Sequence, residues 1–254
     1  MEKLAKESRI KCLELVYRAQ TSHIGSLFSC ADLFAVIFSK IDLDKDKFIL
    51  SAGWKACMLY FHLWKKGRIT EEELNSYCQA GSKFIGLAEP VTKDVMIAGG
   101  SMGLGFPGAV GLALAKKLKK EEGLVYVLMS DGEMQCGTTW EAALVAAHHQ
   151  LGNLVVIVDR NNLQAMGKTE EILRINPLGS KWMSFGWHFR SVDGHDYGQI
   201  ESIMIVPKDQ LQPTVVVAET TKGKGVSLWE NNNLWHYAQI KEDDYKYALS
   251  CLNS

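Results

Sequence analysis

The sequence predicts an α/β protein whose mostly parallel sheet has helices on both faces. Three runs rich in valine and isoleucine support this prediction, at residues 123–129, 153–159 and 213–219. They are apolar at successive positions and alternate with helical stretches, which is typical of parallel strands covered on both sides. With 254 residues, of which 47% are hydrophobic and 22% charged, the chain is long enough to bury such a core as one domain. We therefore expect a single domain over residues 1–254.

The N-terminal portion, about 90 residues long, is expected to be mainly helical. Apolar residues at helical spacing predict helices at about 3–20, 30–40 and 54–66, with a short extended segment at 46–51. Thr70 followed by Glu73 is the capping-box signature of a further helix start.

The remaining two thirds of the chain alternate between helices and strands. A glycine-rich loop at 98–108 leads into a helix that ends near residue 120 in several lysines, which suit a helix C-terminus. Further helices are expected at about 138–150 and 195–206, and the run at 187–192 predicts a shorter strand.

Composition narrows the function classes. The formal net charge of −1 gives no basic footprint for nucleic acid or an anionic membrane surface. The first 15 residues contain charges every few positions, and no stretch approaches the roughly 18 apolar residues of a membrane span. The six cysteines are scattered without metal-ligand spacing, so we expect reduced, mostly buried thiols. We expect a cytoplasmic protein.

Polar residues follow the first two valine-rich strands. Asp131-Gly132 follows one and Asn161-Asn162 the next. If these strands adjoin, Asp131 and Asn161 meet at the carboxyl edge of the sheet, where ligands bind in such folds. Carboxylate and amide oxygens suit Mg²⁺ or Ca²⁺, which would neutralise a diphosphate. Taken singly, each pair is also an ordinary turn sequence.

The order of several motifs resembles the N-terminal half of transketolase, and most closely the short subunit of split, two-gene transketolases. The resemblance extends from about residue 9 to 237. Its motifs are TSHIGS (21–26), FILSAG (48–53), GSMGLG (100–105), SDGEMQCGTTWEA (130–142), NLVVIVDRNNLQAMG (153–167), FGWHFRSVDGHD (185–196) and KGKGVSLWENNNLWHY (222–237).

The resemblance implies thiamine diphosphate as cofactor, bound with Mg²⁺ or Ca²⁺. The implied metal ligands are Asp131, Asn161 and the carbonyl of Leu163. The implied cofactor-binding residues are His23, Trp54, Gly100, Ser101, Met102, Gly103, Asp131, Gly132, Glu133, Asn161 and Lys222. The implied catalytic residues are His23, His236 and Glu141, and His195 is a further polar residue expected near the cofactor. Gly132 is expected to let the backbone approach the diphosphate.

The resemblance also implies a partner. In related enzymes the glutamate that activates the aminopyrimidine belongs to the other half, beyond the part that this chain resembles. We therefore expect the partner to be a pyrimidine-binding, C-terminal-half subunit, in a heterotetramer that acts on a small ketone donor and an acceptor.

Four residues depart from the family pattern. Ser130 replaces the first glycine of Gly-Asp-Gly, and Cys136 replaces a glutamate of a carboxylate chain between active sites, of which Glu141 is retained. Trp54 and Leu87 stand where histidines are expected to contact diphosphate and sugar hydroxyls. Cys136 is either a reactive thiol or a small space-filling residue.

Several functions stay open at this point. The replacements Trp54 and Leu87 favour substrates less hydroxylated than sugar phosphates. Alternatively, they are neutral changes in an ordinary split transketolase that still acts on sugar phosphates. Further alternatives are the α subunit of a 2-oxo-acid dehydrogenase and a non-catalytic, cofactor-holding subunit. A Rossmann nucleotide-binding protein fits least, because no GxGxxG motif follows the first strand.

Overall fold

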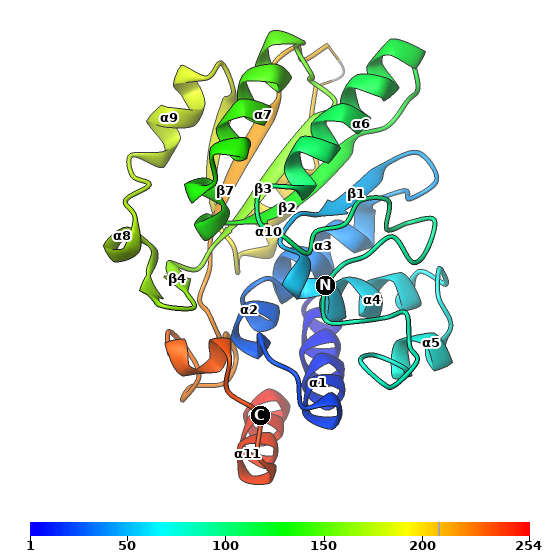
Figure 1. Ribbon diagram of the computed structural model, residues 1–254, viewed down its shortest axis with the longest axis vertical. Helices are drawn as coiled ribbons and strands as arrows, with labels where there is room; N and C mark the ends of the chain where they lie inside the picture. Colours follow the sequence, from blue (N-terminus) through cyan, green and yellow to red (C-terminus); the bar gives the residue numbers. More distant parts are fainter. Residues whose placement is uncertain (208) are drawn as a thin grey trace.

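A five-stranded parallel sheet forms the centre of the computed structural model, which describes residues 1–207 and 209–254 (Figure 1). The strand order is β1-β2-β3-β7-β6, and each neighbouring pair is parallel. The strands are β1 (Lys47–Leu50), β2 (Val125–Ser130), β3 (Leu154–Arg160), β6 (His188–Asp193) and β7 (Thr214–Glu219). A small antiparallel pair, β4 (Leu163–Gln164) and β5 (Gly167–Lys168), follows β3. The predicted fold class is confirmed.

Helices cover both faces of the sheet because its strands are apolar on both sides. In β2, Val125 and Val127 pack with one group of helices, and Tyr126 and Leu128 pack with the other. The first group is α6 (Gly105–Lys119), α7 (Gly137–His148) and α9 (Leu178–Ser184). The second is α1 (Glu2–Ala19), α3 (Ala31–Lys40), α4 (Ala56–Lys65), α10 (Tyr197–Ile203) and α11 (Glu242–Asn253). Figure 1 shows the first group above the sheet and most of the second below it.

The first 90 residues are mainly helical, as predicted, but they also supply the edge strand β1. Helix α5 (Glu71–Asn75) begins with the expected capping box, in which the Glu73 backbone N–H donates to Thr70 Oγ1 at 3.1 Å. The predicted helix over 54–66 is a 3₁₀ turn, η1 (Gly53–Lys55), that continues into α4.

Short elements were missed. They are α2 (Ile24–Ser29), η2 (Asp131–Gln135), α8 (Thr169–Ile172), α9 and η3 (Asn233–His236). Each has seven residues or fewer, so hydrophobic periodicity has too few positions to reveal it. The longer α11 also had no predicted counterpart; it packs on α1.

Within the described residues, no helix is both long and apolar enough to cross a membrane. All six cysteines are unpaired, and Cys12, Cys30 and Cys57 are buried.

Candidate active site

A cavity of about 500 Å³ lies at the carboxyl ends of β2 and β3. These strands are adjacent and in register, so the residues that follow them meet at one edge of the sheet. The cavity is lined by His23, Ser26, Trp54, Lys55, Leu87, Gly100, Ser101, Met102, Ser130, Asp131, Gly132, Asn161, Leu163, Gln164, Ala165, Met166, His236 and Tyr237. Its volume falls in the range of roughly 300–1,000 Å³ typical of small-molecule sites.

Asp131 and Asn161 lie in the floor of this cavity and are almost fully buried. Asp131 Oδ2 accepts hydrogen bonds from the Asn162 backbone N–H at 2.8 Å and from Thr169 Oγ1 at 3.0 Å. Burial, together with the nearby carboxylate of Asp159, raises the pKa of Asp131 to about 6. A cation beside Asp131 would favour its charged form, which burial alone disfavours.

The residues present fit a hard cation and a diphosphate. The Asp131 carboxylate, the Asn161 amide oxygen and the Leu163 carbonyl are all oxygen donors, the type that Mg²⁺ and Ca²⁺ prefer. Gln164 Nε2 is buried and has no hydrogen-bond partner among the described residues, so it is a free donor for an anion. A Cβ added at Gly132 would lie 3.0 Å from this nitrogen, and the glycine therefore leaves the donor open.

Lys55 is a cavity residue that the sequence interpretation missed. Its side chain is fully buried and forms an ion pair with Asp159, which is also fully buried. Burial alone would lower the pKa of Lys55, but the Asp159 carboxylate outweighs that effect and raises it. Ser29 Oγ donates to Asp159 at 2.6 Å, and Thr220 Oγ1 donates to it as well. A fixed positive charge therefore lies in the cavity wall.

A second ammonium group, that of Lys222, lies directly behind the wall. Its Nζ is 2.7 Å from His236 Nδ1 and 3.3 Å from the Leu163 carbonyl oxygen, and both of those residues line the cavity. Burial lowers the pKa of Lys222 to about 8, and the charge of Lys55 acts in the same direction. Lys222 is thus close to the expected oxygen ligands without lining the cavity.

His23 and His236 lie together at the side of the cavity. The His23 backbone N–H donates to the His236 carbonyl at 2.9 Å, and the two ring centroids are 5.1 Å apart. His23 has a left-handed backbone with φ of 72°, an uncommon conformation for a residue with a side chain. Burial first, and then Lys222, lowers the pKa of His23 to about 4 and that of His236 to about 3. Both imidazoles are therefore neutral at pH 7.

A close backbone approach holds the segment that contains Gly100, Ser101 and Met102. The Gly53 N–H donates to the Gly99 carbonyl at 3.0 Å, and a Cβ on Gly53 would lie 2.0 Å from that oxygen. Only glycine allows this approach, which brings residues 100–102 into the cavity wall.

Gly103 and Glu133 were expected to bind the cofactor, but they lie outside the wall. Glu133 Oε1 accepts from the Gly103 N–H at 3.1 Å and from Ser51 Oγ, so this buried carboxylate holds the 100–103 segment from behind. Burial raises the pKa of Glu133 to about 7. The first turn after β2 directs Asp131 and Glu133 to different surroundings.

Glu141 was expected to be catalytic, but it is not brought to the cavity. It lies on the exposed face of α7, because the buried face of that helix contains Thr139, Ala142, Ala143 and Ala146. Its neighbours across the surface belong to α6. Cys136 is half-buried, and burial raises the pKa of its thiol, which disfavours the reactive thiolate.

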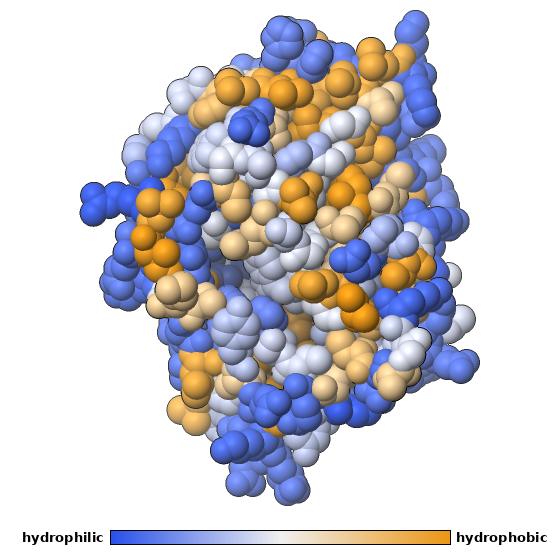
Figure 2. Space-filling view, in the orientation of Figure 1, coloured by the Kyte–Doolittle hydropathy of each residue, from blue (hydrophilic) through white to orange (hydrophobic). Residues whose placement is uncertain are grey.

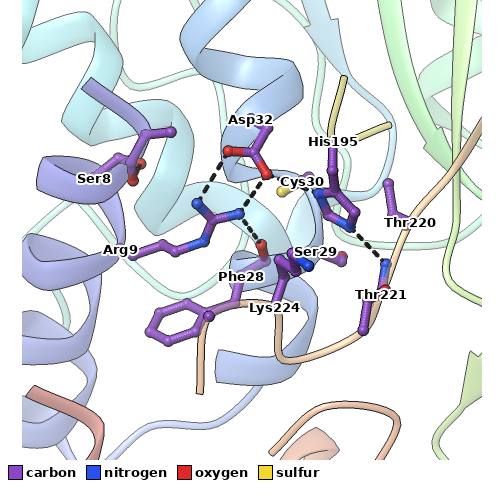
Figure 3. Close-up of polar contacts among 12 residues, drawn as sticks. Ser8, Arg9, Phe28, Ser29, Cys30, Asp32, His195, Thr220, Thr221 and Lys224 are labelled. Atoms are coloured by element: carbon purple, nitrogen blue, oxygen red, sulfur yellow. Dashed lines mark hydrogen bonds and ion pairs between the residues drawn. The ribbon is translucent and has the colours of Figure 1, made fainter. Parts of the chain in front are cut away.

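His195 was also expected near the cofactor. It does not line the cavity; its ring nitrogens contact Asp32 and the backbone of Thr221 (Figure 3). The polar run that contains it follows β6, the far edge strand, two strands away from β3.

Three of the four departures from the family pattern line the cavity, and Ser130 is one of them. Trp54 and Leu87 both line it, and the Trp54 ring centroid is 6.5 Å from that of His23. Met166 and Tyr237 are further lining residues, and they are 88% and 63% exposed. The cavity therefore combines a polar floor with apolar and aromatic walls.

Comparisons with known proteins agree with this geometry. The family model described as the thiamine diphosphate-binding domain of transketolase matches residues 1–252. One subunit of the apulose-4-phosphate transketolase of Actinobacillus succinogenes is 36% identical over 262 residues, which cover 98% of this chain and 94% of that protein. The 6-deoxy-6-sulfo-D-fructose transketolase subunit SqwG of Clostridium sp. is 33% identical over 249 residues, which cover 94% and 90%.

Full-length transketolases match over only part of their length. The crystal structure of Campylobacter jejuni transketolase superposes with a TM-score of 0.93 at 28% identity, and the match covers 99% of this chain but 42% of that one. The chain thus spans nearly all of the two relatives that are single subunits and about two fifths of the full-length enzyme. We conclude that this chain belongs to the transketolase family of transferases and corresponds to the thiamine diphosphate-binding subunit of a split enzyme.

Proposed function

We propose that residues 1–254 form a single domain that is the diphosphate-binding subunit of a heteromeric, thiamine-diphosphate-dependent transferase. The enzyme transfers a two-carbon ketol or acyl unit from a ketone donor to an acceptor. The main support is the convergence of oxygen donors, an unpartnered amide donor and two lysines at one edge of the sheet. When bound, thiamine diphosphate supplies the carbon nucleophile that the side chains lack.

In this proposal, the residues of this chain bind the metal ion and the cofactor and orient the reacting groups. Asp131, Asn161 and the Leu163 carbonyl hold Mg²⁺ or Ca²⁺, and Gln164 and Lys222 meet the diphosphate charge. Gly100, Ser101 and Met102 line the place of the aminopyrimidine. The neutral imidazoles of His23 and His236 exchange hydrogen bonds and protons with the reacting oxygens, since each can donate at one nitrogen and accept at the other.

A binding test distinguishes a subunit that binds the cofactor from one that has only the fold. The chain should retain thiamine diphosphate in the presence of Mg²⁺, with the complex detected by native mass spectrometry, and Asp131→Asn should reduce retention. A chain that binds no cofactor, alone or with its partner, would contradict the proposal.

The apolar wall supports a substrate with fewer hydroxyl groups than a sugar phosphate. Leu87 has no hydrogen-bonding side chain and the Trp54 indole N–H can only donate, so sugar hydroxyls lose the partners that two histidines would give, at a cost of about 1–3 kcal/mol for each unpaired group. Replacing Trp54 and Leu87 together with histidine should therefore raise turnover of xylulose 5-phosphate by the reconstituted enzyme. Unchanged turnover would remove the specificity argument.

Ordinary sugar chemistry is the second candidate, because two relatives are named for apulose 4-phosphate and 6-deoxy-6-sulfo-D-fructose. In that case, the wild-type enzyme should already accept such ketoses, and the double histidine variant should gain little. A non-catalytic subunit would bind thiamine diphosphate without forming a donor adduct.

A partner subunit is the remaining part of the proposal. The relatives of similar length are named as single subunits of transketolases, and exposed apolar residues lie near the cavity and on α6 and α7, among them Met102, Leu104, Leu144 and Val145. Figure 2 shows hydrophobic side chains over α6 and α7 and in the middle of the same face. We propose that a pyrimidine-binding subunit covers this face in a heterotetramer, which native mass spectrometry of the complex from its host would test.

A further inference from the structure

A series of hydrogen bonds among residues that do not line the cofactor cavity joins four distant segments of the protein (Figure 3). Arg9 of α1 donates to both carboxylate oxygens of Asp32 in α3, at 3.0 and 2.6 Å. His195 Nδ1 lies 2.7 Å from Asp32 Oδ2, and its Nε2 accepts from the Thr221 backbone N–H at 2.9 Å. Thr221, the last residue in this series of hydrogen bonds, directly precedes Lys222.

The protonation pattern of His195 follows from its neighbours. Asp32 accepts from Arg9 and from the Tyr197 hydroxyl at 2.7 Å, so it is an ionised acceptor and the proton of His195 must be on Nδ1. The lone pair of Nε2 is then free to accept from Thr221. Both ring nitrogens are satisfied in one neutral tautomer, and the imidazole links a buried carboxylate to a loop backbone.

The Thr220–Gly225 loop borders open space next to His195. Two cavities, of about 610 and 560 Å³, border it, and both are lined in part by His195 and Lys224. The neighbouring backbone groups have other partners: Thr220 N–H donates to the Arg160 carbonyl and Gly223 N–H to the Gly25 carbonyl. Among the described residues, the Thr221 N–H bonds only to His195.

We propose that Asp32 and His195 are positioning residues that fix Thr221, and through it hold the Lys222 ammonium against the cofactor cavity. The proposal rests on the proposed function only in assigning Lys222 to the diphosphate site. Asp32 sets the tautomer and orientation of His195, and His195 fixes the backbone from which Lys222 reaches His236 and Leu163. This assigns a role to the histidine of the Val-Asp-Gly-His-Asp run outside the cavity.

Two substitutions of His195 separate its two bonds. Asparagine places an amide nitrogen near the position of Nδ1, so it keeps the donor to Asp32 and loses the acceptor for Thr221. Glutamine reaches the position of Nε2 and keeps the acceptor. Tyr197→Phe is the matched control, because it removes a different donor from Asp32 without contacting the loop.

The test uses the full chain, with any subunit that co-purifies, and has two readouts. One is hydrogen exchange of the Thr221 amide, and the other is the Kd of thiamine diphosphate with Mg²⁺. His195→Asn should accelerate exchange and weaken binding by about 2- to 10-fold, the worth of one neutral hydrogen bond. His195→Gln and Tyr197→Phe should stay within about twofold of wild type, below that range.

Equal protection of Thr221 in His195→Asn and wild type would overturn the proposal, as would equal losses in all three variants. If exchange changes as expected but the wild-type chain binds no thiamine diphosphate, the proposed function fails while the positioning of the loop stands. The exchange readout therefore judges the positioning independently of the cofactor.

Discussion

Replacing Lys55 with methionine should destabilise the protein strongly, because the Lys55–Asp159 ion pair is fully excluded from solvent. The substitution leaves the Asp159 carboxylate buried, with neutral donors from Ser29, Thr220 and Asn161 as its remaining partners. Removing one partner of a buried pair costs about 3–5 kcal/mol. For a chain of this size that corresponds to a fall in Tm of roughly 6–20 °C, at about 2–4 °C per kcal/mol.

The assay is urea and thermal unfolding of wild type, Lys55→Met, Asp159→Asn and the double variant. Because the double variant no longer buries an unpaired charge, it should be more stable than Lys55→Met. Lys65→Met is the matched control: its ion pair with Glu7 is more than one third exposed on both sides, and exposed pairs contribute about 0–1 kcal/mol. A loss below about 1 kcal/mol in Lys55→Met, or a double variant no more stable than it, would refute the reasoning.

Three further predictions concern pH, backbone and metal. Burial holds the pKa of His62 at about 3, so below its unfolded value of about 6.5 only the unfolded state takes up the proton, and stability should fall by about 2 kcal/mol between pH 7.5 and pH 5. Urea titrations at the two pH values should show that His62→Phe loses about 2 kcal/mol less than wild type. His23 and His236 act in the same direction as His62 and Glu133 acts in the opposite one, so the difference between the two proteins is the test. Gly53→Ala should lower the free energy of unfolding by about 1–3 kcal/mol or more and weaken cofactor binding. Gly111→Ala should not destabilise the protein, because no atom of the described residues lies within 4 Å of the added Cβ. Asp131→Asn should lower Mg²⁺ affinity of the cofactor complex by about tenfold or more in calorimetry, and unchanged affinity would exclude Asp131 as a ligand.

The fold class was predictable because its signal repeats along the sequence. Each of the runs that form β2, β3 and β7 is apolar at successive positions, and only a sheet covered on both faces buries all of those side chains. Elements of one or two turns, such as α2 and η3, have no comparable repeat. Their place depends on contacts with segments far along the chain, such as the bond between His23 and His236.

The same contrast holds for the candidate site. Asp131 and Asn161 could be placed together from the sequence, since both follow adjacent parallel strands and such ends meet at one edge. Glu141 and Glu133 could not be assigned a surface from their distance to Asp131 along the chain, because the 3₁₀ turn and the orientation of α7 decide which way each carboxylate points.

The sequence by itself determined the alternation of strands and helices, the edge of the sheet where polar residues gather, and the family motifs. Tertiary structure alone decided that Lys55 reaches Asp159 across 104 positions, and that His195 lies against Asp32 and Thr221 rather than in the cavity. Periodicity and strand ends are local properties that each segment shows independently. Charge pairing in the interior depends on how α1, α3, α4 and the β6–α10 connection pack together, and no local pattern contains that information.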